Sequence, residues 1–134
     1  MSVWLHLPKD MSYSKGTKGE RELLSMFYDE GFVGFRAPSS GSTTDRELPD
    51  ILVGDGEKTY AIESKRADEG PVYLPHEEAE DLSFFSLMFG ADALIAFRED
   101  YGDWNFWKPN ELYSTGNSFR VQNEKEARKF TEII

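Results

Sequence analysis

The sequence contains no cysteine and only two histidines, His6 and His76, and its apolar segments are short. Without cysteine the chain cannot form disulfide bonds, use thiol catalysis or bind zinc or iron–sulfur clusters through thiolates. Two isolated histidines argue against a histidine-ligated metal site. No apolar run approaches the ~18 residues of a membrane-spanning helix, and no basic region precedes an apolar stretch at the start. We therefore expect neither export nor membrane insertion, but a cytoplasmic protein.

The length of 134 residues is sufficient for one domain with a core and too short for two ordinary ones. Hydrophobic residues make up 39% of the chain and aromatic residues 14%, which excludes a disordered tail. Residues 1–14 show no sustained periodicity and are interpreted as an N-terminal extension, and residues 15–134 as a single domain.

The formal charge of -10 is concentrated in one part of the chain. Residues 67–104 contain ten acidic side chains and a single basic one, Arg98. An acidic protein repels nucleic acid and anionic membranes as a whole, although the nearly neutral first half can still present a basic surface. Two interpretations stay open: an ordinary acidic protein, or a surface adapted to molar salt, which screens repulsion within ~3 Å.

Helix and strand signals alternate along the chain. A helix is predicted from Ser14 to a glycine cap at Gly31, and a second from about Pro75 to Gly90. A Gly-Asp-Gly turn joins two strands as a hairpin. The other predicted elements are a strand at 32–36, a loop at 37–48, the hairpin strands 51–53 and 58–65, strands at 93–97 and 103–108, and a final helix at 123–133. The order α-β-β-β-α-β predicts an α/β fold with a mixed central sheet flanked by helices.

Three charged side chains meet on this hairpin. Asp50 opens one arm and lies opposite residues 61 to 63 of the other, so Asp50 and Glu63 are neighbours. Glu63 and Lys65 are two residues apart and project from the same face. Two close carboxylates disfavour each other's ionisation, and a divalent cation such as magnesium removes that cost. A neighbouring ammonium can orient or deprotonate a metal-bound water, which suits phosphodiester hydrolysis.

The pattern Pro49-Asp50, twelve residues, then Glu63-Ser64-Lys65 resembles the PD-(D/E)xK nuclease superfamily. The preceding run KGTKGERELLSMFYDEGFVGFR closely resembles the first helix and strand of the archaeal Holliday junction resolvases, and Ser39 to Ser42 resemble their serine-bearing loop. The resemblance extends from Lys15 to Phe97 and implies a restriction-endonuclease-like core in a single nuclease domain.

The resemblance implies a role for each residue of the site. Glu20 would be the helix-borne acidic residue, for which a capping box with Thr17 is an equal alternative. Asp50 and Glu63 would bind the metal together with Glu20 and the backbone carbonyl of Ser64. Lys65 would position the attacking water. The cofactor would be Mg²⁺, with Mn²⁺ able to replace it.

DNA contacts are also implied. Arg36 would bind a backbone phosphate, or form a salt bridge at the strand end. The loop serines Ser39, Ser40 and Ser42 stand where the family has a serine near the scissile phosphate, with the choice among the three left open, or they serve only as loop residues. The remaining candidates for a phosphate track are Lys15, Lys18, Arg21 and Arg66. The second helix is acidic at Glu77, Glu78, Glu80 and Asp81, so we expect that face not to touch DNA.

We therefore expect a magnesium-dependent endonuclease that resolves four-way DNA junctions as a homodimer by paired nicks in recombination and repair. We expect it in the cytoplasm, associated with the nucleoid. Whether a cell or a virus encodes the chain stays open. A dimer face could come from Phe84, Phe85, Phe89, Trp104, Phe106 and Trp107, although core packing is the more frequent role of each. The alternatives are a nuclease of duplex, flap or nicked DNA, and a non-catalytic junction-binding module. The intact set of Glu20, Asp50, Glu63 and Lys65 argues against the latter.

Overall fold

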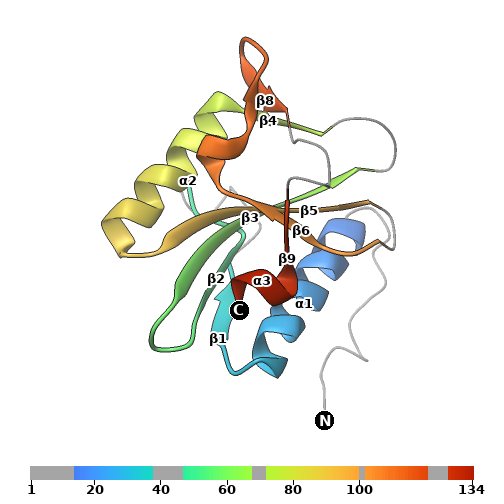
Figure 1. The fold of residues 1–134 in the computed structure, drawn as a ribbon, viewed down its shortest axis with the longest axis vertical. Helices are drawn as coiled ribbons and strands as arrows, with labels where there is room; N and C mark the ends of the chain where they lie inside the picture. Colours follow the sequence, from blue (N-terminus) through green and yellow to red (C-terminus); the bar gives the residue numbers. More distant parts are fainter. Residues whose placement is uncertain (1–13, 38–46, 68–71, 100–101, 121–126) are drawn as a thin grey trace.

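A computed structural model describes residues 14–37, 47–67, 72–99, 102–120 and 127–134. Its centre is a mixed sheet of six strands in the order β1-β2-β3-β5-β6-β9 (Figure 1). The β3–β5 pair is parallel, and the other pairs in this sheet are antiparallel. The strands are β1 (Val33–Arg36), β2 (Ile51–Gly54), β3 (Thr59–Ala67), β5 (Asp92–Glu99), β6 (Asn105–Trp107) and β9 (Arg128–Lys129). The predicted mixed α/β architecture is confirmed.

Helices cover both faces of this sheet. α1 (Ser14–Asp29) and α3 (Phe130–Ile133) pack on one face, where Phe27 and Ile133 join Ile62 in a buried cluster. α2 (His76–Phe89) packs on the other, where Leu82 joins Ala61. Figure 1 shows α2 on one side of the sheet and α1 with α3 on the other. None of the helices in the described ranges is long and apolar enough to cross a membrane.

The predicted ends of the two long helices are confirmed. Gly31 and Gly90 follow α1 and α2, and both have a φ of 89°. Glycine adopts this left-handed conformation without the steric cost that a Cβ would bring. α1 begins at Ser14, so Glu20 lies in the second turn and not at the third position of a capping box with Thr17.

A small second sheet lies beside the N-terminal end of α2 (Figure 1). Its order is β4-β8-β7, with antiparallel pairing throughout. The strands are β4 (Tyr73–Pro75), β7 (Tyr113–Ser114) and β8 (Ser118–Arg120), and a short 3₁₀ helix η2 (Pro109–Glu111) precedes β7. The sequence did not predict these strands, because two or three residues are too few for an alternating pattern to stand out.

The predicted final helix at 123–133 is wrong. Arg128 and Lys129 form strand β9 against β6, and only Phe130–Ile133 is helical among the described residues of this segment. The unpaired edge of β6 gives Arg128 and Lys129 backbone hydrogen-bond partners that a continued helix would not. Residues 121–126 lie outside the described residues.

Three of the six aromatic residues considered for a dimer face belong to the core. Trp104, Phe106 and Trp107 are buried. Phe85 is partly buried, whereas Phe84 and Phe89 are exposed on α2. Core packing, the more frequent role expected of each aromatic residue, therefore does not hold for Phe84 and Phe89. Ala79, Leu82 and Ser86 form the buried side of α2.

Residues 1–13, which make up nearly all of the predicted extension, lie outside the described residues, as do residues 38–46 of the loop. The extension and the role of the loop stay predictions.

Candidate active site

The β2–β3 hairpin brings Asp50 to the predicted position. Ile51 pairs with Ile62, so Asp50 and Glu63 flank this pair at the end of the hairpin far from the turn. Asp50 Oδ2 accepts the backbone N–H of Ser64 at 2.9 Å and the Ser64 hydroxyl at 3.3 Å. The backbone carbonyl of Asp50 accepts the N–H of Ala37 at 2.9 Å, which ties the site to the end of β1.

The carboxyl of Glu63 is held in a setting that disfavours its ionised form. Burial is the main cause, and the negative charge of Asp50 and a hydrogen bond with it add to the effect. Together they raise the pKa of Glu63 to about 9, although the Lys65 ammonium opposes this. Two carboxyl groups in this arrangement favour a bound proton or a bound cation between them.

Glu20 reaches the site from α1. Arg36 Nε donates a hydrogen bond to Glu20 Oε1 at 3.2 Å, and both side chains are 19% exposed. Burial and then the charge of Asp50 raise the pKa of Glu20, while Arg36 and a hydrogen bond with Ser64 lower it. Glu20 is thus electrostatically coupled to Asp50, and Arg36 forms the strand-end salt bridge that was one of its two predicted roles.

Lys65, like Glu63, projects from the face of the sheet that α2 covers. Its Nζ donates a hydrogen bond to Glu78 Oε2 at 3.0 Å. Sequence reasoning missed this partner, since Glu78 was considered only as one of the acidic residues of the second helix that were expected not to touch DNA. The available signal was spacing: Glu78 precedes Leu82 by four residues and therefore shares its face of the helix.

The proposed phosphate track is only partly visible. Lys18 is exposed, and Arg21 is half-buried on α1. The side chains of Lys15 and Arg66 and the serines Ser39, Ser40 and Ser42 lie outside the described part of the structure. Their roles in DNA binding stay predictions.

The residues around Asp50 fit a magnesium ion. Among the described residues, no three acidic or histidine side chains stand close enough to form a metal group by themselves. Magnesium does not require one, because it is held in proteins through one or two carboxylates while keeping several waters. The adjacent pair of Asp50 and Glu63, with its unfavourable shared charge, supplies such carboxylates.

A mixed sheet whose central hairpin carries Asp50, Glu63 and Lys65 at one end, with an acidic residue added from the first helix, has the architecture of the PD-(D/E)xK nucleases.

Comparisons with known proteins narrow this class. The model of the archaeal Holliday junction resolvase (Hjc) family matches residues 11–134. Crossover junction endodeoxyribonuclease Hjc of Archaeoglobus fulgidus is 37% identical over 108 residues, which cover 81% of this chain and 79% of the relative. The Hjc of Sulfolobus acidocaldarius is 32% identical over 125 residues, or 90% of this chain and 87% of the relative.

The solved structures agree with the sequence relatives. The 1.6 Å structure of A. fulgidus Hjc, a Holliday junction resolvase, has a TM-score of 0.82 to this chain at 32% sequence identity. The match covers 88% of this chain and 98% of that one. The chain therefore belongs to the archaeal Holliday junction resolvase family.

Proposed function

We propose that this chain is a magnesium-dependent endonuclease that resolves four-way DNA junctions at the nucleoid in recombination and repair. The observation that carries the proposal is the juxtaposition of Asp50 with Glu63 at the end of the hairpin, beside Lys65, in a chain of this family. The relatives are named crossover junction endodeoxyribonucleases.

Each residue of the site has a chemical task in this proposal. Asp50 and Glu63 hold the metal, with the Ser64 carbonyl as a further oxygen ligand and Glu20 as the acid on the α1 side. A bound Mg²⁺ neutralises charge on the phosphate and favours a hydroxide nucleophile. Manganese, which also prefers oxygen ligands, replaces it. Lys65 orients the attacking water, and Arg36 holds Glu20 in place and is available to an approaching phosphate.

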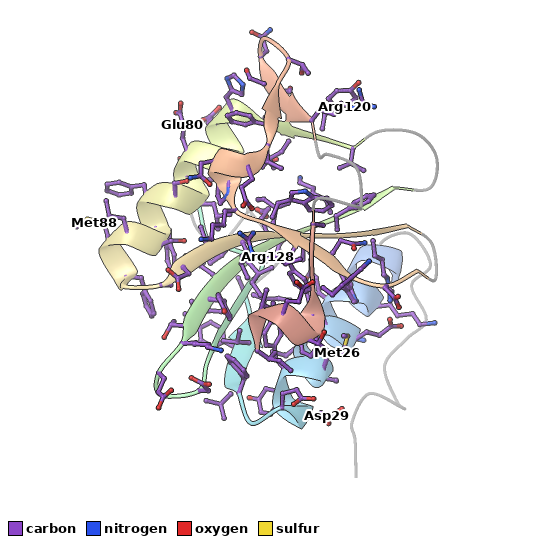
Figure 2. The ribbon with its side chains drawn as sticks, in the orientation of Figure 1. Met26, Asp29, Glu80, Met88, Arg120 and Arg128 are labelled. Atoms are coloured by element: carbon purple, nitrogen blue, oxygen red, sulfur yellow. The ribbon has the colours of Figure 1, made fainter. Side chains whose placement is uncertain are left out.

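Resolution of a junction requires two cuts, and each chain contains one such site. We propose a homodimer in which α2 provides the interface. Phe84, Leu87, Met88 and Phe89 are 55% to 78% exposed, and we call them the apolar surface of α2. Figure 2 shows Met88 on the side of α2 that points away from the sheet. An exposed apolar surface of this kind is typical of an interaction site.

The test is cleavage of a labelled immobile four-way junction with Mg²⁺ and excess linear duplex as competitor. We expect paired symmetric nicks that survive the competitor. Asp50→Asn should abolish cleavage while junction binding persists, because the substitution removes a metal ligand and leaves the phosphate contacts. Cutting of only linear, flap or nicked DNA would reject the junction assignment and favour the alternative nuclease. Tight junction binding by the wild type with no cutting would favour the binding module.

The same assay at low and at molar potassium chloride tests the acidic surface. We propose that the charge of -10 is an adaptation to high salt. Added salt normally weakens DNA binding steeply, since the release of DNA counterions into a concentrated salt solution gains less free energy. Cleavage that persists at molar salt supports the adaptation, whereas cleavage only at low salt identifies an ordinary acidic protein.

A further inference from the structure

An ion pair joins β3, the strand of Glu63 and Lys65, to α2. Lys65 Nζ lies 3.0 Å from Glu78 Oε2, with the Lys65 side chain 25% exposed and that of Glu78 42% exposed. The negative charge of Glu78 also raises the pKa of Glu63. Lys65 therefore lies close to two acids, Glu63 on its own strand and Glu78 on the facing helix.

The packing of α2 fixes Glu78 in this place. Ala79 and Leu82 are buried against the sheet, which sets the rotation of the helix about its axis. Glu78 lies in the first turn, where the helix dipole stabilises a carboxylate. Glu77 lies in the same turn but is exposed, which provides a natural comparison.

The ion pair with Glu78 restricts the positions that the Lys65 ammonium can occupy. Lysine has a flexible stem of four carbons and three donor hydrogens. Without a second anion, the ammonium is free to pair directly with Glu63 and Asp50 and so compete with a cation for these carboxylates. When the ammonium donates one of its three N–H groups to Glu78, the other two can donate hydrogen bonds to a water or a phosphate oxygen.

We propose that Glu78 is the positioning residue of Lys65: it draws the ammonium toward α2, so that Lys65 orients the attacking water without neutralising the metal-binding carboxylates. The inference rests on the proposed role of Lys65 in cleavage. Glu78 itself touches neither the metal nor the DNA and acts only through Lys65.

The experiment measures single-turnover junction cleavage with saturating enzyme and Mg²⁺, together with junction affinity. Glu78→Gln, which preserves shape and removes the charge, should slow cleavage by about 10- to 100-fold, as for other groups that orient a catalytic residue. Its junction affinity should stay at the wild-type level. Glu78→Asp should recover part of the rate, and Glu77→Gln should cleave like the wild type.

A double-mutant cycle separates positioning from general structural damage. In the Lys65→Ala background, Glu78→Gln should cause no further loss of rate, because its only route of action is already gone. A fully additive loss would overturn the proposal, as would a wild-type rate for Glu78→Gln while Lys65→Ala is impaired. Wild-type cleavage by Lys65→Ala would instead reject the proposed role of Lys65, and with it the basis of this inference.

Discussion

The carboxyl of Glu63 carries a larger electrostatic cost than an exposed glutamate, because burial and Asp50 both oppose its ionisation. A carboxyl with a higher pKa in the folded state binds more protons there than in the unfolded chain. Stability is then present below the unfolded value of 4.5 and is lost as the pH rises toward the folded value of about 9. The raised pKa of Glu20 acts in the same direction.

The loss of stability caused by the Glu63 carboxyl is measurable when no metal is bound. With EDTA present, Glu63→Gln should be more stable than the wild type by at least ~1 kcal/mol at about pH 8.5, and the difference should shrink toward about pH 5. Urea unfolding at both pH values measures it. The lowered pKa values of Asp55 and Glu111 act only below about pH 4.5, outside this window.

The exposed Glu57 at the hairpin turn provides the control. Glu57→Gln should have the same pH dependence of stability as the wild type. Adding Mg²⁺ should stabilise the wild type more at the higher pH, because displacing the proton from Glu63 costs less free energy as the pH approaches the pKa of this carboxyl. Equal pH slopes for the wild type and Glu63→Gln would contradict the assigned environment of this carboxyl.

At the scale of elements, β1 is an edge strand, and a side chain of α1 forms hydrogen bonds with backbone groups on its outer edge. The Tyr28 hydroxyl donates to the Gly34 carbonyl at 2.8 Å and accepts the Gly34 N–H at 3.1 Å. Unpaired edge groups of a sheet otherwise recruit strands from other chains. Gly34 also has to be glycine, because a Cβ there would collide with the Leu52 carbonyl oxygen of β2.

We therefore expect Tyr28→Phe to lower the free energy of unfolding by ~0.5–1.5 kcal/mol and to increase self-association through β1. Urea unfolding and light scattering measure the two effects. Tyr73→Phe is the matched control, since Tyr73 is exposed to a similar degree and no hydrogen bond of its hydroxyl is found in the described part of the chain. The same loss of stability in both variants would show that Tyr28 does not act through Gly34.

The elements that the sequence predicted well are those with local signals at both ends. The glycines at 31 and 90 mark the helix ends, and the turn between β2 and β3 fixes the register that sets Asp50 beside Glu63. The strand at Arg128–Lys129 depends instead on backbone groups of β6, more than twenty residues earlier in the chain. Such non-local pairing leaves no periodic pattern in two residues.

The residues of the candidate site also fall into those that local sequence signals predicted and those that depend on contacts between separate elements. Asp50, Glu63 and Lys65 lie on one hairpin, so strand geometry was enough to place them together. The partner of Lys65 comes from a helix outside the hairpin, and its identification needed the rotation of α2 against the sheet. The contact of Glu20 with Arg36 likewise joins two elements across sixteen residues.

At the scale of the whole molecule, the acidic and the apolar residues of α2 lie at different ends of the helix, and this separation is relevant to the proposed homodimer. The acidic residues of α2 lie toward its first turns, whereas its apolar surface lies toward the last. Burial of a large apolar side chain contributes ~1.5–3 kcal/mol, so the exposed residues of α2 in two copies can stabilise an interface. A dimer through α2 would also bring two of the proposed sites into one particle.

The last prediction tests this dimer. Leu87→Glu places a charge in the centre of the apolar surface of α2, and we expect the chain to sediment as a monomer where the wild type sediments as a dimer. Circular dichroism should match that of the wild type, because Leu87 is exposed. Paired nicking should fall to single nicks, since each site then meets the junction alone. Asn117→Glu, an equal charge on the exposed β7–β8 turn, should stay dimeric. If the Leu87→Glu variant is still dimeric and still makes paired nicks, the dimer interface does not lie on α2.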